Sequence, residues 1–225
     1  MQAPPAAVSA LPERSRATKQ RLLDAAERLF AERGFEGTSL RAVTQAAGAS
    51  VSAANYHFGS KESLLRATLL RRVEPVNRRR LERLDELERG AGGAPLAVEA
   101  ILDAFFRPTI EVRSASAEGA AQYRQVAARL YSDPPEIVSA LARDLFRPIR
   151  DRFVVALARA LPQRGHDEIL VALHFTVGVM VHVIAGHLDP PPADDGAAVR
   201  LSDEALLRRL VAYTAAGVRA CGAGA

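Results

Sequence analysis

Apolar residues recur at helical spacing along most of the chain, and this pattern constrains the fold more than any other feature. In the segment 18–34, TKQRLLDAAERLFAERG, apolar side chains stand at positions 22, 23, 26, 29 and 30. Further helical runs are expected near 60–90, 95–114, 119–131, 135–161, 166–188 and 200–220, with Gly- and Pro-containing loops between them. Pro75 is expected to kink or break the first of these. Alternating β-branched runs with hairpin signals do not occur, so the sequence predicts an all-α protein.

Positive charge is concentrated in the N-terminal third of the chain. Residues 1–72 contain eleven Lys/Arg and six Asp/Glu, a net charge of +5, whereas residues 73–225 contain nineteen and twenty, a net charge of −1. A basic N-terminal part indicates a polyanionic partner such as nucleic acid. The alternative is a solvated basic face without a partner.

Several features bear on the cellular compartment. The lone Cys221 cannot form an internal disulfide, which fits a reducing cytoplasm. Residues 1–15 are rich in Pro and Ala, lack the regions of a signal peptide, and are expected to form a disordered arm. Residues 169–188 carry no charge and are long enough to span a membrane. Three histidines and the lack of an aromatic belt favour a buried helix there instead, so no membrane association is expected.

A helix, a glycine turn and a second short helix are expected within residues 38–58. The first helix is capped by Thr38 or Ser39 and ends at Gly48, and the second covers about 51–56. Two helices joined by a short Gly-containing turn form a helix-turn-helix, whose second helix enters the DNA major groove. The alternative is a three-helix mini-core that buries the aromatic residues at the end of this segment.

The side chains of this segment suit contacts with DNA. Asn55 can pair with adenine through two hydrogen bonds, and hydroxyl and N–H groups at the start of the first helix can hold a phosphate. The candidate DNA-binding residues are Thr38, Ser39, Arg41, Ser50, Val51, Ser52, Ala53, Asn55, Tyr56, His57 and Lys61. Arg14, Arg16, Lys19 and Arg21 add a basic stretch that could reach an adjacent groove or the backbone.

The segment Arg21–Leu69 resembles the N-terminal domain of the TetR family of transcriptional regulators. The motifs LLDAAERLFAERGF and TSLRAVTQAAGAS carry the resemblance, together with Tyr-His-Phe followed by Ser-Lys-Glu. The commoner family form has Gly in place of Ser52 and often Tyr in place of Asn55, and the segment NYHFGSK resembles a subset of the family. These departures affect the operator sequence that is read, not the mode of binding.

After the disordered arm 1–15, the resemblance implies two parts: a DNA-binding domain 16–62 and an effector-binding and dimerisation domain 63–222. It implies a homodimer joined through the helices near 166–188 and 200–220. It also implies a small-molecule pocket among residues 80–185, and the apolar middle of the chain suggests a hydrophobic effector. The candidate lining residues, for which ordinary core packing is the alternative, are Phe105, Phe106, Tyr123, Val126, Leu130, Tyr131, Phe146, Phe153, His174, Phe175 and Met180.

The function expected is that of a cytoplasmic, homodimeric and ligand-responsive regulator that binds a palindromic double-stranded DNA operator. Release of a repressor by its effector is the leading mechanism; an activator of the same family and a helical sensor without DNA binding are the alternatives. The motifs G-x-S-x-G, H-E-x-x-H, the Walker loop and G-x-G-x-x-G are absent, so no enzyme and no cofactor is expected. His174 and His182 are eight residues apart, which does not suit shared metal ligation, so no metal site is expected either.

Overall fold

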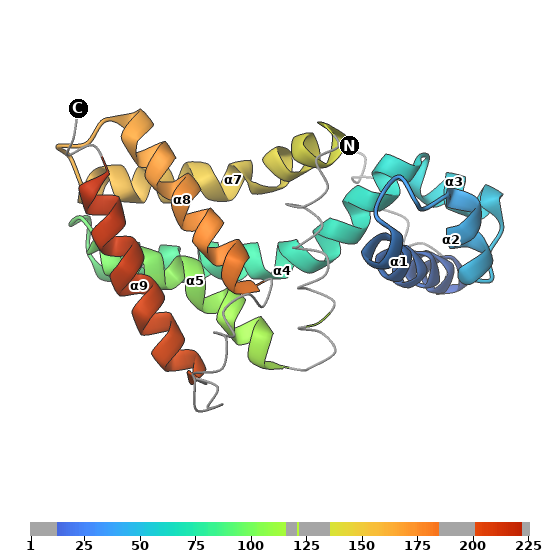
Figure 1. Ribbon diagram of the computed structural model, residues 1–225, viewed down its shortest axis with the longest axis horizontal. Coiled ribbons are helices and arrows are strands. Elements are labelled where there is room, and N and C mark those ends of the chain that lie inside the picture. Colours follow the sequence, from blue (N-terminus) through green and yellow to red (C-terminus); the bar gives the residue numbers. More distant parts are fainter. Residues whose placement is uncertain (1–12, 116–120, 122–135, 185–200, 222–225) are drawn as a thin grey trace, which may run out of the picture. The chain divides into compact units, whose positions relative to one another are not determined.

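The computed structural model describes residues 13–115, 121, 136–184 and 201–221, and these contain helices and no strand (Figure 1). The helices are α1 (Glu13–Arg33), α2 (Leu40–Ala46), α3 (Val51–Phe58), α4 (Lys61–Gly90), α5 (Val98–Ala115), α7 (Glu136–Ala160), α8 (His166–Ile184) and α9 (Asp203–Ala220). The all-α prediction is confirmed. The helix predicted near 119–131 lies outside the described residues except for Ala121. Two compact units, divided after Thr68, each have their own packing.

The N-terminal unit is built on one face of α1. Leu22, Ala26 and Phe30 are buried on that face, and they share a core with Val43 of α2 and Ala54 of α3. The helix ends at Gly34, whose φ of 72° is the left-handed conformation that favours glycine.

Helix α1 begins at Glu13, earlier than the periodic stretch 18–34 indicates. Residues 13–15, which were predicted to belong to a disordered arm, are therefore helical; residues 1–12 lie outside the described part of the chain. The Thr18 hydroxyl donates to the carbonyl of Arg14 at 3.0 Å, a bond within the helix.

Prolines lie inside three helices and end none of them. Pro75 is exposed within α4, Pro108 lies within α5 and Pro148 within α7. A proline removes one backbone hydrogen bond, but the helix continues through Pro75, with Val73 and Val76 buried on either side of that residue. A break at Pro75, one of the two expected outcomes, is wrong, because α4 runs continuously from Lys61 to Gly90.

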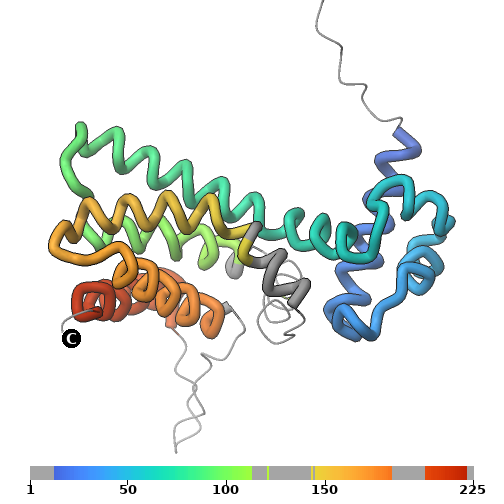
Figure 2. Tube along the Cα trace, turned by 90° about the horizontal axis from the view of Figure 1, so that it is seen from above, coloured from blue at the N-terminus to red at the C-terminus, as the bar shows by residue number. Residues whose placement is uncertain are grey.

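The C-terminal unit surrounds a single apolar core. Helix α5 packs along α9, and α8 packs against both α7 and α9, so that α8 and α9 lie side by side (Figures 1 and 2). Three aromatic rings meet in this core: the Phe105 ring packs edge-on against Phe106 and Phe153, with centroids 5.5 and 5.2 Å apart. Such edge-to-face pairs add to the stabilisation from burial alone.

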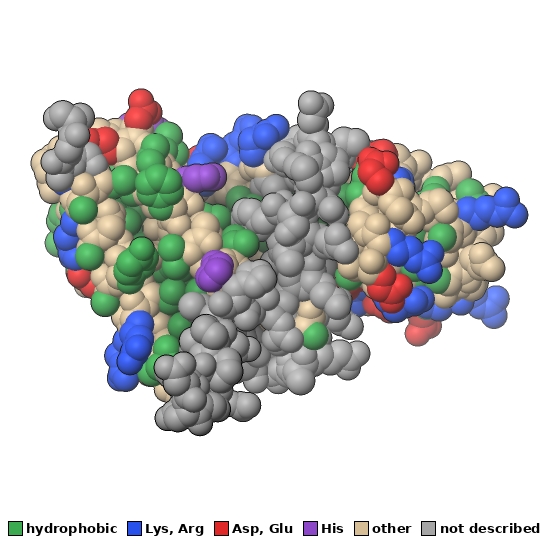
Figure 3. All heavy atoms as spheres, viewed as in Figure 1, with side chains coloured by type: hydrophobic (Ala, Val, Ile, Leu, Met, Phe, Trp, Pro, Cys, Tyr) green, Lys and Arg blue, Asp and Glu red, His purple; other side chains and the backbone are tan. Residues whose placement is uncertain are grey.

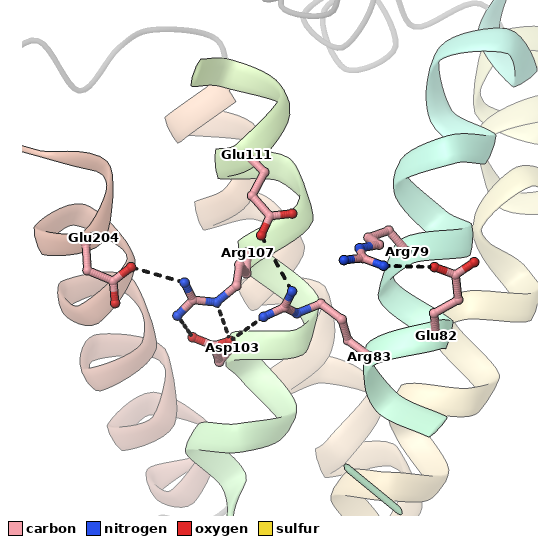
Figure 4. Close-up of polar contacts among 7 residues, drawn as sticks. All are labelled: Arg79, Glu82, Arg83, Asp103, Arg107, Glu111 and Glu204. Carbon is pink, nitrogen blue, oxygen red and sulfur yellow. Dashed lines mark hydrogen bonds and ion pairs between the residues drawn. The ribbon is translucent and has the colours of Figure 1, made fainter. Parts of the chain in front are cut away.

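An ion-pair network joins α4, α5 and α9 at the half-exposed edge of this unit (Figure 4). Arg107 binds both carboxylate oxygens of Asp103, at 2.8 and 2.7 Å, and reaches Glu204 of α9 at 3.1 Å. Arg83 of α4 lies 3.9 Å from Asp103 and 3.5 Å from Glu111. The hydrogen bonds that Arg107 donates to Asp103, and to a lesser extent to Glu204, raise the pKa of Arg107 above its ordinary value.

Candidate nucleic-acid interface

Two serine caps and a glycine turn define the geometry between α2 and α3. The Ser39 Oγ accepts a hydrogen bond from the N–H of Ala42, and the Ser50 Oγ accepts one from the N–H of Ala53, each at 3.1 Å. Gly48, with a φ of 57°, lies in the turn between the helices. Each serine hydroxyl accepts a hydrogen bond from a backbone N–H that has no partner within its own helix. The two serines therefore determine where the helices begin. The predicted helix-turn-helix geometry is present.

The inward side of the two helices is small and apolar. Val43 and Ala47 are buried, Leu40 is half-buried, and Ala54 is the buried residue of α3. Small side chains at these positions allow α2 and α3 to cross closely. The Arg21 guanidinium of α1 donates to the Gly48 carbonyl at 3.4 Å and ties the turn to the first helix.

The outward side of α3 presents the residues that were predicted to read DNA. The Tyr56 side chain is 74% exposed. Exposed with it are Ser50, Val51, Ser52 and Asn55 of this segment and Ser39 and Arg41 of the preceding helix, while Ala53 and His57 are half-buried. The exposed side chains at the start of α2 and along α3 are thus hydroxyl, amide, basic, aliphatic and aromatic groups.

The prediction that Thr38 holds a phosphate is wrong. Thr38 is only 1% exposed, and its hydroxyl lies 2.8 Å from the Gly34 carbonyl and 3.1 Å from that of Leu29. Its backbone N–H donates to the carbonyl of Phe35 at 3.2 Å. Both polar groups are thus used inside the unit, and the exposed hydroxyl at the start of α2 belongs to Ser39.

Lys61, a predicted DNA-binding residue, makes contacts inside the N-terminal unit. Its Nζ donates to the Phe35 carbonyl at 3.1 Å and lies 4.0 Å from the centroid of the Phe35 ring. The sequence carries no local signal for this pair, because the two residues are 26 positions apart. An ammonium has three donors, so a further contact with a phosphate is compatible with this geometry.

The start of α4 is capped by Ser60. The Ser60 Oγ accepts a hydrogen bond from the N–H of Ser63 at 3.1 Å. The pKa of Glu62 lies below its ordinary value, because its carboxylate accepts a hydrogen bond from its own backbone N–H and one from Ser60. A carboxylate in the first turn also interacts favourably with the helix dipole. The basic residues Arg14, Arg16 and Arg21 are exposed on α1, and Lys19 is half-buried.

The residues predicted to line an effector pocket divide into three groups. Phe105, Phe106, Phe153 and Met180 are buried together in the C-terminal core, and Phe146 is half-buried. Tyr123, Val126, Leu130 and Tyr131 lie outside the described residues. The prediction for His174 and Phe175 is wrong for an interior pocket, since both are exposed. Helix α8 buries Ile169, Ala172, Leu173, Thr176 and Met180, which leaves positions 174 and 175 on its outer side.

Arg80 is a polar centre of this core that the predictions omit. Its residue is 1% exposed, and its guanidinium donates to the carbonyl of Phe105 at 2.8 Å and to the side chain of Asn77 at 2.9 Å. The sequence does contain a signal: position 80 falls on the same helical stripe as Val76 and Leu84. Within the run Arg78–Arg80, this is the arginine that faces inward, whereas Arg78 and Arg79 are exposed.

The described residues bear on two other kinds of site. They contain no group of three or more His, Cys, Asp or Glu that could hold a metal ion. One helix, over His166–Val183, is long and apolar enough to cross a membrane by length and composition, a test that core helices of soluble proteins also pass.

Comparison with known families identifies both parts of the chain. Residues 22–68 match the family "Bacterial regulatory proteins, tetR family", and residues 103–217, just over half of the chain, match "Tetracyclin repressor-like, C-terminal domain". The chain belongs to the TetR family. The family assignment agrees with the resemblance seen in the sequence, although the particular residues of the NYHFGSK segment stay a prediction for DNA reading.

Relatives of this TetR-family chain match part of its length. It is 44% identical over 50 residues to the HTH-type transcriptional repressor AcnR of Corynebacterium glutamicum, covering 22% of this chain and 27% of AcnR. It is 34% identical over 85 residues to the HTH-type transcriptional regulator UidR of Escherichia coli K12, covering 38% of this chain and 41% of UidR. The matches thus span less than half the length of either relative.

Solved structures resemble the TetR-family chain over most of its length. A tetR-family regulatory protein from Rhodococcus RHA1 has a TM-score of 0.58 at 19% identity, covering 89% of this chain and 96% of that one. AibR, solved with isovaleryl coenzyme A and operator DNA, has a TM-score of 0.59 at 20% identity, covering 87% of this chain and 97% of AibR. At these identities the likeness shows the shared fold.

Proposed function

We propose that this TetR-family chain is a homodimeric transcriptional regulator that binds a palindromic operator and is released from it by a small molecule. The observation that carries the proposal is the capped α3, which presents Asn55, Tyr56 and the residues from Ser50 to Ser52 outward. A second helix with an exposed polar face is the reading element of a helix-turn-helix.

DNA contacts divide into base reading and backbone binding. Asn55 is the amide side chain suited to adenine, and Ser52 can bond with several bases. Ser39, Arg41, Tyr56 and the basic residues of α1 would bind phosphates, which fix the register without reading sequence. Because the target is intracellular DNA, this function places the protein in the cytoplasm.

The exposed apolar side chains of α8 and α9 support dimerisation through these two helices. Phe175 is 61% exposed, and Val171 of the same helix and Tyr213 of α9 are also exposed. Green hydrophobic side chains gather over α8 and α9 in Figure 3. Apolar surface in one patch marks an interaction site. A second copy of the chain would cover this patch, and two α3 helices would then face two successive half-sites.

Helix α4 is our candidate for transmitting the effector signal. It begins with Lys61, next to the proposed DNA-binding surface, and continues through Arg80, which lies in the C-terminal core. AibR, which shares the fold, was solved with an acyl coenzyme A and operator DNA. A hydrophobic effector that favours another position of α4 would shift the population of DNA-bound protein. Structures with and without effector that superpose along α4 would contradict this mechanism.

A gel shift with the promoter region beside its own gene tests the proposed function. We expect a shift that weakens steeply with salt and disappears when an effector is added. DNA binding that increases with effector would indicate an activator. No shift at low salt, together with retained small-molecule binding, would indicate a sensor without DNA binding and would overturn the proposal.

A further inference from the structure

The first residue of α3 is apolar and nevertheless exposed. Val51 directly follows the capping residue Ser50, and 44% of its surface is exposed. Among the described residues of the N-terminal unit, the exposed large hydrophobic side chains are those of Val51 and Tyr56, and both belong to α3. The tyrosine has a hydroxyl that can bind a phosphate, whereas the valine side chain has no polar atom. Val51 is therefore the exposed side chain of α3 that needs an apolar partner.

The start of the helix determines where Val51 stands. The Ser50 Oγ accepts a hydrogen bond from the N–H of Ala53 at 3.1 Å, so that α3 begins at Val51. Val51 and Asn55 are both exposed and are four residues apart, whereas Ala54 is buried. Side chains four residues apart on a helix share a face, with their Cβ atoms about 5–6 Å apart. The valine is thus the neighbour of the amide that we expect to read adenine.

The major groove of DNA offers one apolar group to such a side chain. Base edges present hydrogen-bond donors and acceptors, and thymine adds its C5-methyl group. A hydrocarbon side chain that covers a donor, an acceptor or a phosphate oxygen removes water from it and supplies no hydrogen bond in return, which costs free energy. The residues at the start of a reading helix are those that reach the base edges. The thymine methyl group is the part of a base edge that Val51 can cover favourably.

We propose that Val51 packs against the C5-methyl group of a thymine and selects thymine at one position of each half-site. This inference rests on the proposed DNA-binding function and specifies part of the sequence that α3 reads. The spacing of Val51 and Asn55 also places the thymine. Because successive base pairs are about 3.4 Å apart, the thymine lies within about two base pairs of the adenine that Asn55 reads.

Replacement of single thymines by deoxyuridine tests this contact, because uracil lacks only the C5-methyl group. The full-length protein first selects its site from a pool of DNA duplexes with a randomised centre. Duplexes of the selected sequence are then made with deoxyuridine in place of each thymine in turn. We expect one thymine in each half-site at which this exchange raises the Kd of the wild-type protein about fourfold, the contribution of one buried methyl group.

Variants of the first turn of α3 assign the effect to Val51. Val51→Ala should bind thymine and deoxyuridine equally well at that position and should keep its response at every other thymine. Val51→Ile retains a branched apolar side chain, so it should keep the preference for thymine. Ser52→Ala is the matched control, because it changes an exposed residue of the same turn, and it should keep the preference too. Val51 and Ser52 are both exposed, so these variants remove no buried contact.

The proposal is overturned if every thymine responds to the exchange equally in the wild type and in Val51→Ala. It is also overturned if the selected half-site has no thymine within about two base pairs of the position that Asn55→Ala alters. Either result leaves DNA binding intact, so the proposed function would stand without this contact. Failure to select any sequence, together with no shift of any duplex at low salt, would instead overturn the proposed function and this contact with it.

Discussion

At the scale of single residues, Lys61 makes two contacts within the N-terminal unit. Its ammonium bonds to the Phe35 carbonyl at 3.1 Å and lies over the Phe35 ring. A charged hydrogen bond contributes about 1.5–3 kcal/mol and an exposed cation–π contact about 0.5–1, so Lys61→Met should lower the free energy of unfolding by about 1–3 kcal/mol. Chemical denaturation measures this loss, with Lys19→Met, the other lysine of the chain, as the control.

The same variant tests whether Lys61 also binds DNA. If one of its remaining donors binds a phosphate, the slope of log affinity against log salt falls by about 1. The measurement is a salt titration of operator binding under conditions in which both proteins are folded. An unchanged slope beside a lower stability would mean that Lys61 acts only within its own unit.

Asn55 is the residue on which sequence reading by this chain should depend most. Its exposed amide can be removed without affecting the helix end, where Gly59 donates to the backbone carbonyl of residue 55. Asn55→Ala should weaken operator binding by about 1–3 kcal/mol, through the lost contact with one base, and should change binding to random DNA little. Competition binding with single-base operator variants measures the difference. Equal losses on operator and random DNA would contradict base reading by Asn55.

At the scale of elements, α3 depends on its N-cap because it is an eight-residue helix. The Ser50 Oγ accepts from the Ala53 N–H at 3.1 Å. Removing such a cap costs about 1 kcal/mol, so Ser50→Ala should lower the stability of the free protein by that amount. Ser52→Ala, an exposed change in the first turn of the same helix, is the matched control and should be neutral or slightly stabilising. Equal effects of both changes would show that the cap does not stabilise α3.

The network around Asp103 connects three helices and should stabilise more than an isolated surface pair. Asp103→Asn removes the negative charge that both Arg107 and Arg83 face. We expect it to lower the free energy of unfolding by about 1 kcal/mol. Glu82→Gln is the control: Glu82 pairs with Arg79 on the exposed face of α4, where a loss of less than about 0.5 kcal/mol is expected. Denaturation at low and high salt checks this, since screening should reduce the Asp103 effect. A loss at Glu82 as large as that at Asp103 would contradict the network.

The helices of the N-terminal unit could be predicted because their signals are local. Ser39, Ser50 and Gly48 lie within a few residues of the helix ends that they determine. The role of Thr38 could not be predicted in the same way, because Thr38 and Ser39 are neighbouring residues that both carry a hydroxyl. Only the packing against the end of α1 turns the Thr38 side chain inward. Contacts between distant positions, such as Lys61 with Phe35, have no local signal at all.

The C-terminal unit was predictable as helices but not as a site. Periodicity identifies α8, yet a helix that is apolar on every side does not reveal which side faces the core of its own chain. Phe175 was therefore assigned to the interior, although it lies on the surface. Arg80 was overlooked because arginines usually lie at the surface, even though its position on the apolar stripe of α4 marks it as buried.

At the scale of the whole molecule, the outer side of α8 determines whether the chain can act on a two-part operator. Phe175→Glu places a charge in the centre of the proposed dimer patch, where it would be desolvated without a partner. We expect the mass in sedimentation equilibrium to fall from that of a dimer to the 24.2 kDa of one chain. Binding to a palindromic operator should fall with it, since a monomer holds one half-site.

The matched control is Val155→Glu, which makes the same kind of change at an exposed valine of α7. Far-UV circular dichroism shows whether both variants keep their helices, so that a loss of mass can be assigned to the interface. A dimeric Phe175→Glu beside a monomeric Val155→Glu would place the interface on α7. If both variants and the wild type are monomers, the apolar side of α8 and α9 serves another partner, and operator reading must be achieved by single chains.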